Sequence, residues 1–202
     1  MTDLTTGGKV LPITRWGTPV MHAKTRPVEK FDEELHTLIR DMFATMEAAE
    51  GVGLAATQVG VDLAVFVYEC PDADNEIHRG VVCNPTVTLP EGKDRVLDSG
   101  EEGCLSHPGG YSQVSRPNTA VCKGQDENGN EITVEGTGLL ARCLQHETDH
   151  LNGTVFGDRL STRARRQLDK EVAALDWRYP DDWPVSPKRV AATPPGAAEE
   201  AE

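Results

Sequence analysis

The chain has 202 residues, of which 38% are hydrophobic and 26% charged, and its net charge is −13. This length suits one domain with a sizeable core. The excess of acid argues against sequence-specific or general nucleic-acid binding and against anionic lipid. No apolar run is long enough for a membrane span, and no signal peptide is visible. Five cysteines, an odd number, indicate a reducing cytoplasm rather than a disulfide framework.

The first predicted elements come in the order helix, loop and strands. Apolar residues at helical spacing predict a helix over 32–50, with Asp32 as N-cap and Gly51 as the first residue past the C-cap. A loop of small residues follows over 51–60. We then expect a buried strand over 63–69 and one or two strands over 80–89, broken at Asn84-Pro85.

A second β region is predicted over about 112–135, with a hairpin turn at Asn128-Gly129. A helix follows over 138–151, between Thr137 as N-cap and Gly153. We expect its apolar residues to pack inward, namely Leu139, Leu140, Cys143 and Leu144. A last helix is expected over 161–174. Residues 1–183 would form a single catalytic domain, and 184–202 a disordered tail rich in Pro, Ala and acid.

These elements define an α+β fold in which antiparallel strands pack around the central helix. A long N-terminal helix and a C-terminal helix complete it. The central helix carries His146-Glu147-Thr148-Asp149-His150. Histidines four residues apart lie on one helix face and can bind one metal ion, and Glu147 can then reach a water on that metal. Such a pattern arises by chance with a frequency on the order of 1%.

A catalytic metal needs a third protein ligand and an open fourth position. Our choice for the third ligand is Cys104, which lies among glycine and proline residues that can bend the backbone toward a ligand. Two alternatives remain open. Cys143 is a rival thiol on the same helix as the histidines. His107 makes a Cys-x-x-His spacing with Cys104 and would close a structural zinc site with four ligands.

Three segments together resemble the peptide deformylase family, bacterial type. They are a glycine, alanine and glutamine segment at 51–58, Glu-Gly-Cys-Leu-Ser at 102–106, and the helical motif at 145–153. The similarity extends in outline from about residue 11 to about residue 175. The acidic C-terminal tail lies outside the family core.

The resemblance implies a cytoplasmic hydrolase that removes the formyl group from N-formylmethionine of new polypeptides. The implied cofactor is one divalent metal, Fe²⁺ in cells, with Zn²⁺, Ni²⁺ or Co²⁺ as replacements. A metal-bound hydroxide would attack the formyl carbon, while Glu147 takes its proton and passes it to the amine. The side chain of Gln58 and the backbone N–H of Leu105 would stabilise the oxyanion.

The resemblance also implies residues that bind substrate. Gly53 would let the backbone approach an extended peptide. The methionine pocket would be lined by Val52, Leu139, Arg142 and Cys143. The head of Arg142 would then point outward. Glu102 would orient the site by pairing with an arginine such as Arg142.

Two other functions remain as alternatives, a different HExxH metallohydrolase such as a small peptidase, and a non-catalytic module stabilised by zinc. The segment 159–170 adds a question about partners, because its five positive residues and one acid give a net charge of +4. It is either a solvated helix face or a weak, salt-dependent contact with the ribosome.

Overall fold

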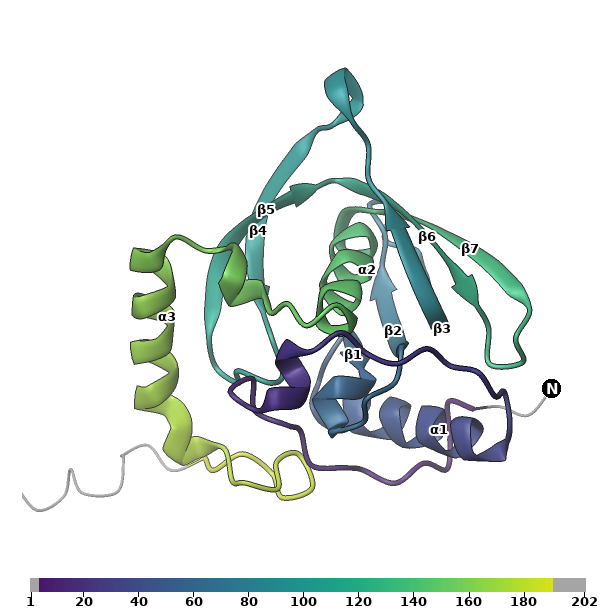
Figure 1. Ribbon diagram of the computed structural model, residues 1–202. Coiled ribbons are helices and arrows are strands. Elements are labelled where there is room, and N and C mark those ends of the chain that lie inside the picture. Colours follow the sequence, from purple (N-terminus) through teal and green to yellow (C-terminus); the bar gives the residue numbers. More distant parts are fainter. Residues whose placement is uncertain (1–3, 191–202) are drawn as a thin grey trace, which may run out of the picture.

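The computed structural model describes residues 4–190. It is an α+β fold, as predicted (Figure 1). The helices are α1 (Glu33–Ala48), α2 (Gly138–Leu151) and α3 (Thr162–Leu175). The strands are β1 (Gly53–Ala55), β2 (Val65–Pro71), β3 (Ile77–Thr88), β4 (Leu97–Gly103), β5 (Tyr111–Pro117), β6 (Thr119–Gln125) and β7 (Glu131–Thr137).

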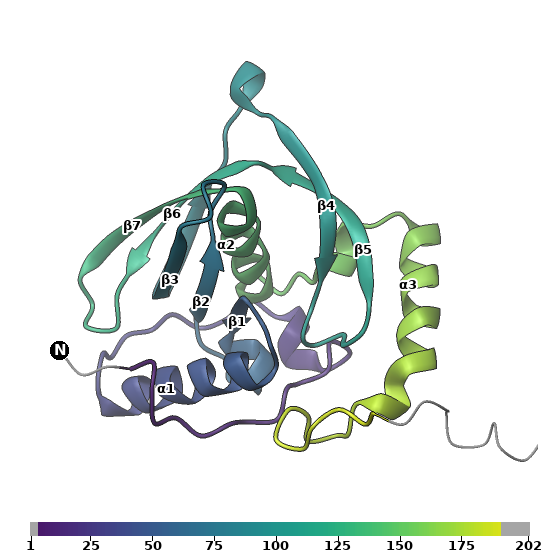
Figure 2. The same ribbon diagram turned by 180° about the vertical axis from the view of Figure 1, so that it is seen from behind.

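The strands form two antiparallel sheets around α2. One sheet has the order β1-β2-β3-β6-β7, and the other is the β4-β5 hairpin. Figures 1 and 2 show α2 between the larger sheet and the hairpin, with α1 across one end and α3 outside the hairpin. The helix therefore has protein on most of its surface, which explains why its polar residues are buried as well as its apolar ones.

The start of α1 agrees with the sequence, and its end is one residue different. The Asp32 carboxylate caps the helix by accepting from the backbone N–H groups of Glu34 and Leu35. At the other end Ala49 is the C-cap, and Glu50 follows with a left-handed φ of 57°. The N–H of Gly51 then bonds the carbonyl of Met46 at 2.9 Å. Gly51 is thus the second residue past the cap, as this type of helix end requires.

Part of the predicted strand pattern differs from the structure. Residues 77–88 form one strand, and the expected break at Asn84-Pro85 is a shift in its register against β6. A proline at such an irregularity costs no ladder hydrogen bond. Sequence reasoning missed β4, because its residues are mostly polar and exposed and carry no alternating apolar pattern.

Helix α2 has the predicted bounds, and Gly153 takes the expected positive φ of 74°. Leu140 and Leu144 are fully buried against the larger sheet. The inward placement of Leu139 was wrong, because its side chain is 39% exposed. The Thr137 hydroxyl does not cap the helix and instead accepts from the backbone N–H of Ala73.

The C-terminal helix was predicted to within one residue at each end. Beyond it the chain returns to the domain, where the N–H of Ile13 donates to the carbonyl of Trp183 at 2.8 Å. Of the expected disordered tail, residues 184–190 are described, and Lys188 contacts Glu50. Residues 191–202 lie outside the described part of the chain. None of the described helices combines the length and apolar character that crossing a membrane would need.

Packing of α2 can be tested with two leucines of that helix. We expect Leu144→Ala to lower the free energy of unfolding by about 2–5 kcal/mol, because it opens a cavity in the core. Leu139→Ala is the matched control and should cost less than about 1 kcal/mol, because its side chain is partly in solvent. Urea denaturation followed by circular dichroism measures both. Equal losses would contradict this assignment of the buried face.

Candidate metal centre and catalytic cleft

Three predicted ligands converge in the interior. The thiol of Cys104 and the imidazole nitrogens of His146 and His150 all lie within 4.8 Å of one another, and all three residues are buried. The Sγ atom of Cys104 is 3.3 Å from Nε2 of His150, which is 3.1 Å from Nε2 of His146. One thiol and two imidazoles are a donor set that first-row divalent metals favour.

Glu102 fixes the orientation of one of these histidines. Its carboxylate oxygen Oε1 lies 2.7 Å from Nδ1 of His146, which leaves Nε2 of the ring facing the other two ligand atoms. A carboxylate behind a histidine ligand is a common arrangement at metal sites, because it sets the tautomer and makes the ring a better donor. The buried donors and their orientation therefore fit a metal ion.

Two arginines hold Glu102 in turn. Arg116 donates through Nε and Nη2 to the two carboxylate oxygens, at 2.8 and 2.5 Å, and Arg142 donates through Nη1 at 3.0 Å. The pairing with Arg142 was expected. Its outward-pointing head was wrong, because the guanidinium also donates to the Val114 carbonyl at 2.9 Å and is buried. Sequence reasoning missed Arg116, since nothing in the sequence marks which arginine faces inward.

This cluster changes the acidity of Glu102. Burial by itself raises the pKa of the carboxyl group, but the hydrogen bonds from Arg116 and His146 and their positive charges outweigh burial. The pKa of Glu102 is therefore held well below its usual range. The carboxylate therefore stays charged at neutral pH while these partners are in place.

Glu147 lies beside the three candidate ligands, and no arginine or histidine donates a hydrogen bond to it among the described residues. Its side chain is buried, and its Oε2 atom has no hydrogen-bond partner among the described residues. Burial is the main cause that raises the pKa of Glu147 to about 7. A Cβ atom on Gly53 would lie 2.5 Å from its Oε1, so that only glycine lets β1 pass this close. The carboxylate is thus available to exchange a proton.

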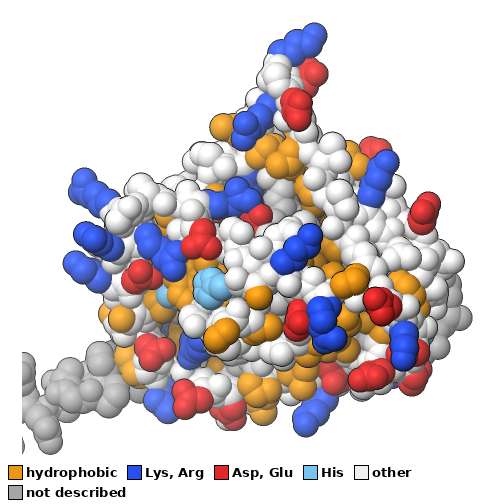
Figure 3. Space-filling model, in the orientation of Figure 1, with side chains coloured by type: hydrophobic (Ala, Val, Ile, Leu, Met, Phe, Trp, Pro, Cys, Tyr) orange, Lys and Arg blue, Asp and Glu red, His pale blue; other side chains and the backbone are white. Residues whose placement is uncertain are grey.

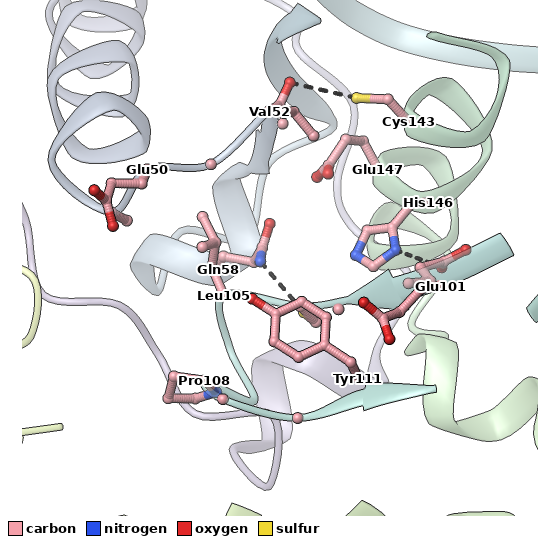
Figure 4. Close-up of a pocket in the computed structure, with 18 of the residues that line it drawn as sticks. Glu50, Val52, Gln58, Glu101, Leu105, Pro108, Tyr111, Cys143, His146 and Glu147 are labelled. Atoms are coloured by element: carbon pink, nitrogen blue, oxygen red, sulfur yellow. Dashed lines mark hydrogen bonds and ion pairs between the residues drawn. The ribbon is translucent and has the colours of Figure 1, made fainter. Parts of the chain in front are cut away.

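Gln58 faces the cluster from the other wall. Its Oε1 atom accepts from the backbone N–H of Ala55 at 2.8 Å, which orients the amide so that Nε2 lies 3.6 Å from Sγ of Cys104. Leu105 follows Cys104 directly and lines the same cavity. Figure 4 shows Gln58, His146 and Glu147 pointing into one space.

The cavity has a volume of about 340 Å³. It brings together nearly all the predicted site residues, while His150 lies fully buried behind it. The members that sequence reasoning had placed there are Val52, Gly53, Gln58, Glu102, Cys104, Leu105, Leu139, Arg142, Cys143, His146 and Glu147. Other lining residues were not anticipated, among them Glu50, Tyr111, Tyr179, Trp183 and Lys188.

Neither of the alternative ligands, Cys143 and His107, lies in the group formed by Cys104, His146 and His150. The thiol of Cys143 lies 3.5 Å from the carbonyl oxygen of Val52, as a donor to it, and forms part of the cavity wall. His107 stacks on the ring of Trp16 with 3.5 Å between centroids, and its Nε2 lies 3.5 Å from Asp169. Both side chains are therefore engaged elsewhere.

The donors and the free carboxylate define a class, hydrolases that use one protein-bound metal ion. A family model described as Polypeptide deformylase matches residues 10–166. The chain belongs to this family and is an enzyme of the kind that removes the N-formyl group from nascent peptides.

Individual relatives agree with that assignment. Peptide deformylase 1 of Streptomyces avermitilis is 53% identical over 174 residues, which cover 86% of this chain and 80% of that protein. A peptide deformylase structure from Legionella pneumophila matches with a TM-score of 0.74 and 39% identity, over 83% of this chain and 95% of that one. One from Ehrlichia chaffeensis, in complex with actinonin, has a TM-score of 0.74 and 38% identity, over 82% and 97%.

The role of Glu102 has a consequence for acid stability. Because its pKa is lower in the folded protein than in the unfolded chain, it stabilises the fold above the unfolded value of about 4, and this stabilisation is lost as the pH falls toward the folded pKa. We expect Glu102→Gln to be less stable at pH 7 and to show a flatter loss of stability between pH 5 and 2. Urea unfolding across this range measures it.

The matched control for this experiment is Glu101→Gln, which changes the exposed neighbour on the same strand. Its stability should follow the wild-type curve with pH. A wild-type slope in Glu102→Gln would show that the buried cluster does not carry the acid sensitivity.

Proposed function

We propose that this enzyme removes the formyl group of N-formylmethionyl peptides by metal-dependent hydrolysis. The observation that carries the proposal is the position of Glu147, a buried carboxylate without a partner among the described residues, beside three buried metal donors and on the wall of one cavity. Deformylation needs a proton acceptor that can reach both the attacking water and the leaving amine, and this carboxylate is placed for it.

Cys104, His146 and His150 would hold the metal ion. A divalent metal bound there supplies a positive charge that polarises the formyl oxygen and lowers the pKa of a nearby water. We propose ferrous iron in cells, with zinc, nickel or cobalt as replacements, because a thiolate and two imidazoles suit several of these ions. Glu102 keeps the ring of His146 in the orientation that binding needs.

Glu147 accepts the proton of the attacking water and later delivers it to the departing amine, which balances the proton over the reaction. The formyl oxygen gains negative charge as the water adds. Gln58, through its side-chain amide, and Leu105, through its backbone N–H, donate hydrogen bonds to it. Loss of one such donor typically lowers kcat by about 10²–10³-fold.

The substrate side chain would occupy the part of the cavity between β1 and α2. Val52, Leu139 and Cys143 line that part, and Gly53 lets an extended peptide pair with the backbone. Glu102 and Arg142 also line the cavity, and their charged groups bond each other there. We therefore propose them as positioning residues. The catalytic domain that we propose spans 1–183, with 184–190 packed against it.

The other functions find less support. A peptidase of the HExxH type would use a downstream Glu or His as third ligand, whereas Cys104 completes the cluster here. A zinc-stabilised module would need a fourth protein ligand, and the cluster contains three side chains among the described residues.

Two variants separate these functions. Glu147→Gln should retain its metal and lose about 10²–10⁴-fold in turnover of formyl-Met-Ala-Ser, because the ligands are intact and the proton acceptor is gone. Cys104→Ser should lose both metal and turnover, because a hydroxyl replaces a thiolate. Metal analysis and an assay for released formate measure the two effects. Wild-type activity in metal-loaded Glu147→Gln would refute the mechanism, and unchanged metal content in Cys104→Ser would refute the ligand set.

We also propose a cytoplasmic enzyme that works near the ribosome, where formylated chains emerge. The structure shows which basic residues of the segment 159–170 already have partners within the molecule and which are free to bind RNA. Arg159 bonds Asp149, and Arg165 bonds Asp158 while lying 4.3 Å over the ring of Trp16. The basic residues that remain exposed on α3 are Arg163, Arg166 and Lys170. Figure 3 shows Lys and Arg side chains projecting at this edge of the molecule.

Weak binding to ribosomal RNA through this face should depend steeply on salt, because each phosphate contact releases counterions. We expect co-sedimentation with ribosomes at low salt that fades toward physiological salt. Reversal of Arg163, Arg166 and Lys170 to Glu should abolish it and leave turnover of a free formyl-tripeptide unchanged. A matched control reverses three exposed residues elsewhere, Lys30, Lys93 and Arg95. Equal loss in both triple variants would indicate net charge rather than this face.

A further inference from the structure

One wall of the catalytic cavity comes from a part of the chain beyond the family match. The match ends at residue 166, whereas Tyr179, Trp183 and Lys188 line the cavity. These residues belong to the segment that follows α3 and returns toward the end of α1. This wall is therefore built by residues that lie outside the three motifs that form the candidate metal site.

The segment is fixed at several points. The backbone carbonyl of Trp183 accepts from the N–H of Ile13 at 2.8 Å, and that of Tyr179 accepts from Arg15 at 3.0 Å. The rings of Tyr179 and Trp183 pack edge to face at 5.2 Å, and Trp183 is 8% exposed. These contacts anchor the wall, and Lys188 follows it at the edge of the cavity.

The outer end of the cavity carries three exposed charged residues, Glu50, Glu101 and Lys188. The Lys188 ammonium lies 3.0 Å from Oε2 of Glu50. Figure 4 shows Glu50 and Glu101 on opposite sides of the cavity. With one carboxylate paired, this mouth has a net charge of −1, whereas it would have −2 without the lysine.

A peptide with its formyl group beside Glu147 must leave the cavity through this mouth, because the inner residues are buried and the outer ones exposed. An extended chain advances about 3.3–3.6 Å per residue, so the second and third substrate residues lie within about 10 Å of the first. That distance is close to the screening length of about 8–10 Å at ordinary salt. A charge on those residues must pass the charges of the mouth as the chain leaves the cavity, at separations where salt screens the interaction only in part.

We propose that Lys188 is a specificity-determining residue, which neutralises Glu50 and thereby sets how strongly the enzyme prefers basic over acidic residues just downstream of formylmethionine. This proposal rests on the proposed deformylase function. It assigns to the C-terminal segment a role in substrate choice, separate from the chemistry at the metal.

Two formyl peptides with amidated C-termini test the idea, formyl-Met-Ala-Lys and formyl-Met-Ala-Glu. Lys188→Met leaves two unpaired carboxylates at the mouth and should raise the ratio of kcat/KM for the lysine peptide over the glutamate peptide by about two- to fivefold. Glu50→Gln leaves Lys188 facing Glu101 and should lower this ratio by a similar factor. The double variant has the wild-type net charge of −1 and should return near the wild-type ratio.

Salt and a remote variant provide the controls. At 1 M salt the screening length falls to about 3 Å, so the differences between variants should largely vanish. Arg26→Met removes an exposed arginine paired with Asp62 elsewhere and should leave the ratio unchanged. The same ratio in wild type and Lys188→Met, or an equal loss for both peptides, would overturn the proposal. A wild-type enzyme that cleaves neither peptide would instead refute the deformylase function itself.

Discussion

The bond between Glu102 and His146 is the contact on which the rest of the site depends. Glu102 lies on β4 and His146 on α2, so this bond joins the hairpin that leads to Cys104 to the helix that carries the other two donors. Arg116 on β5 and Arg142 on α2 also donate hydrogen bonds to the Glu102 carboxylate. The three candidate ligand atoms come from these two parts of the chain and lie within 4.8 Å of one another.

Burying the charges of this contact costs free energy, which explains why Glu102 has several charged partners. A buried charge without a partner destabilises a protein by several kcal/mol, and removing one member of a buried pair typically costs 3–5 kcal/mol. Here one carboxylate faces two guanidinium groups and an imidazole, and Asp149 accepts from Arg116 at 2.9 Å. Hydrophobic residues of equal volume would satisfy packing equally well, yet they would not fix the tautomer of His146. What the buried charges add beyond such packing is a constraint on the geometry of the site.

The sequence pointed to the candidate site residues more clearly than to the residues that hold them in place. His146, Glu147 and His150 are recognisable because helical spacing is a local property, and Cys104 and Gln58 lie in short motifs. Arg116 and Lys188 carry no such mark, since their roles arise from contacts with Glu102 and Glu50 that are distant in the chain. Strand β4 was missed for a related reason. It is a strand because its backbone pairs with β5, whereas its own side chains are mostly polar and exposed and show no strand pattern.

Opposite electrostatic environments separate two neighbouring carboxylates. Glu102 accepts from Arg116 and His146, which keeps its pKa low and its charge permanent. Glu147 is equally buried, but it has no such donors, and burial raises its pKa to about 7. Only a group whose pKa lies near the working pH can both take and return a proton, so one carboxylate can serve as a structural anchor and the other as an acid and base. At Gly53 the backbone of β1 passes so close to Glu147 that an added Cβ atom would lie 2.5 Å from its Oε1.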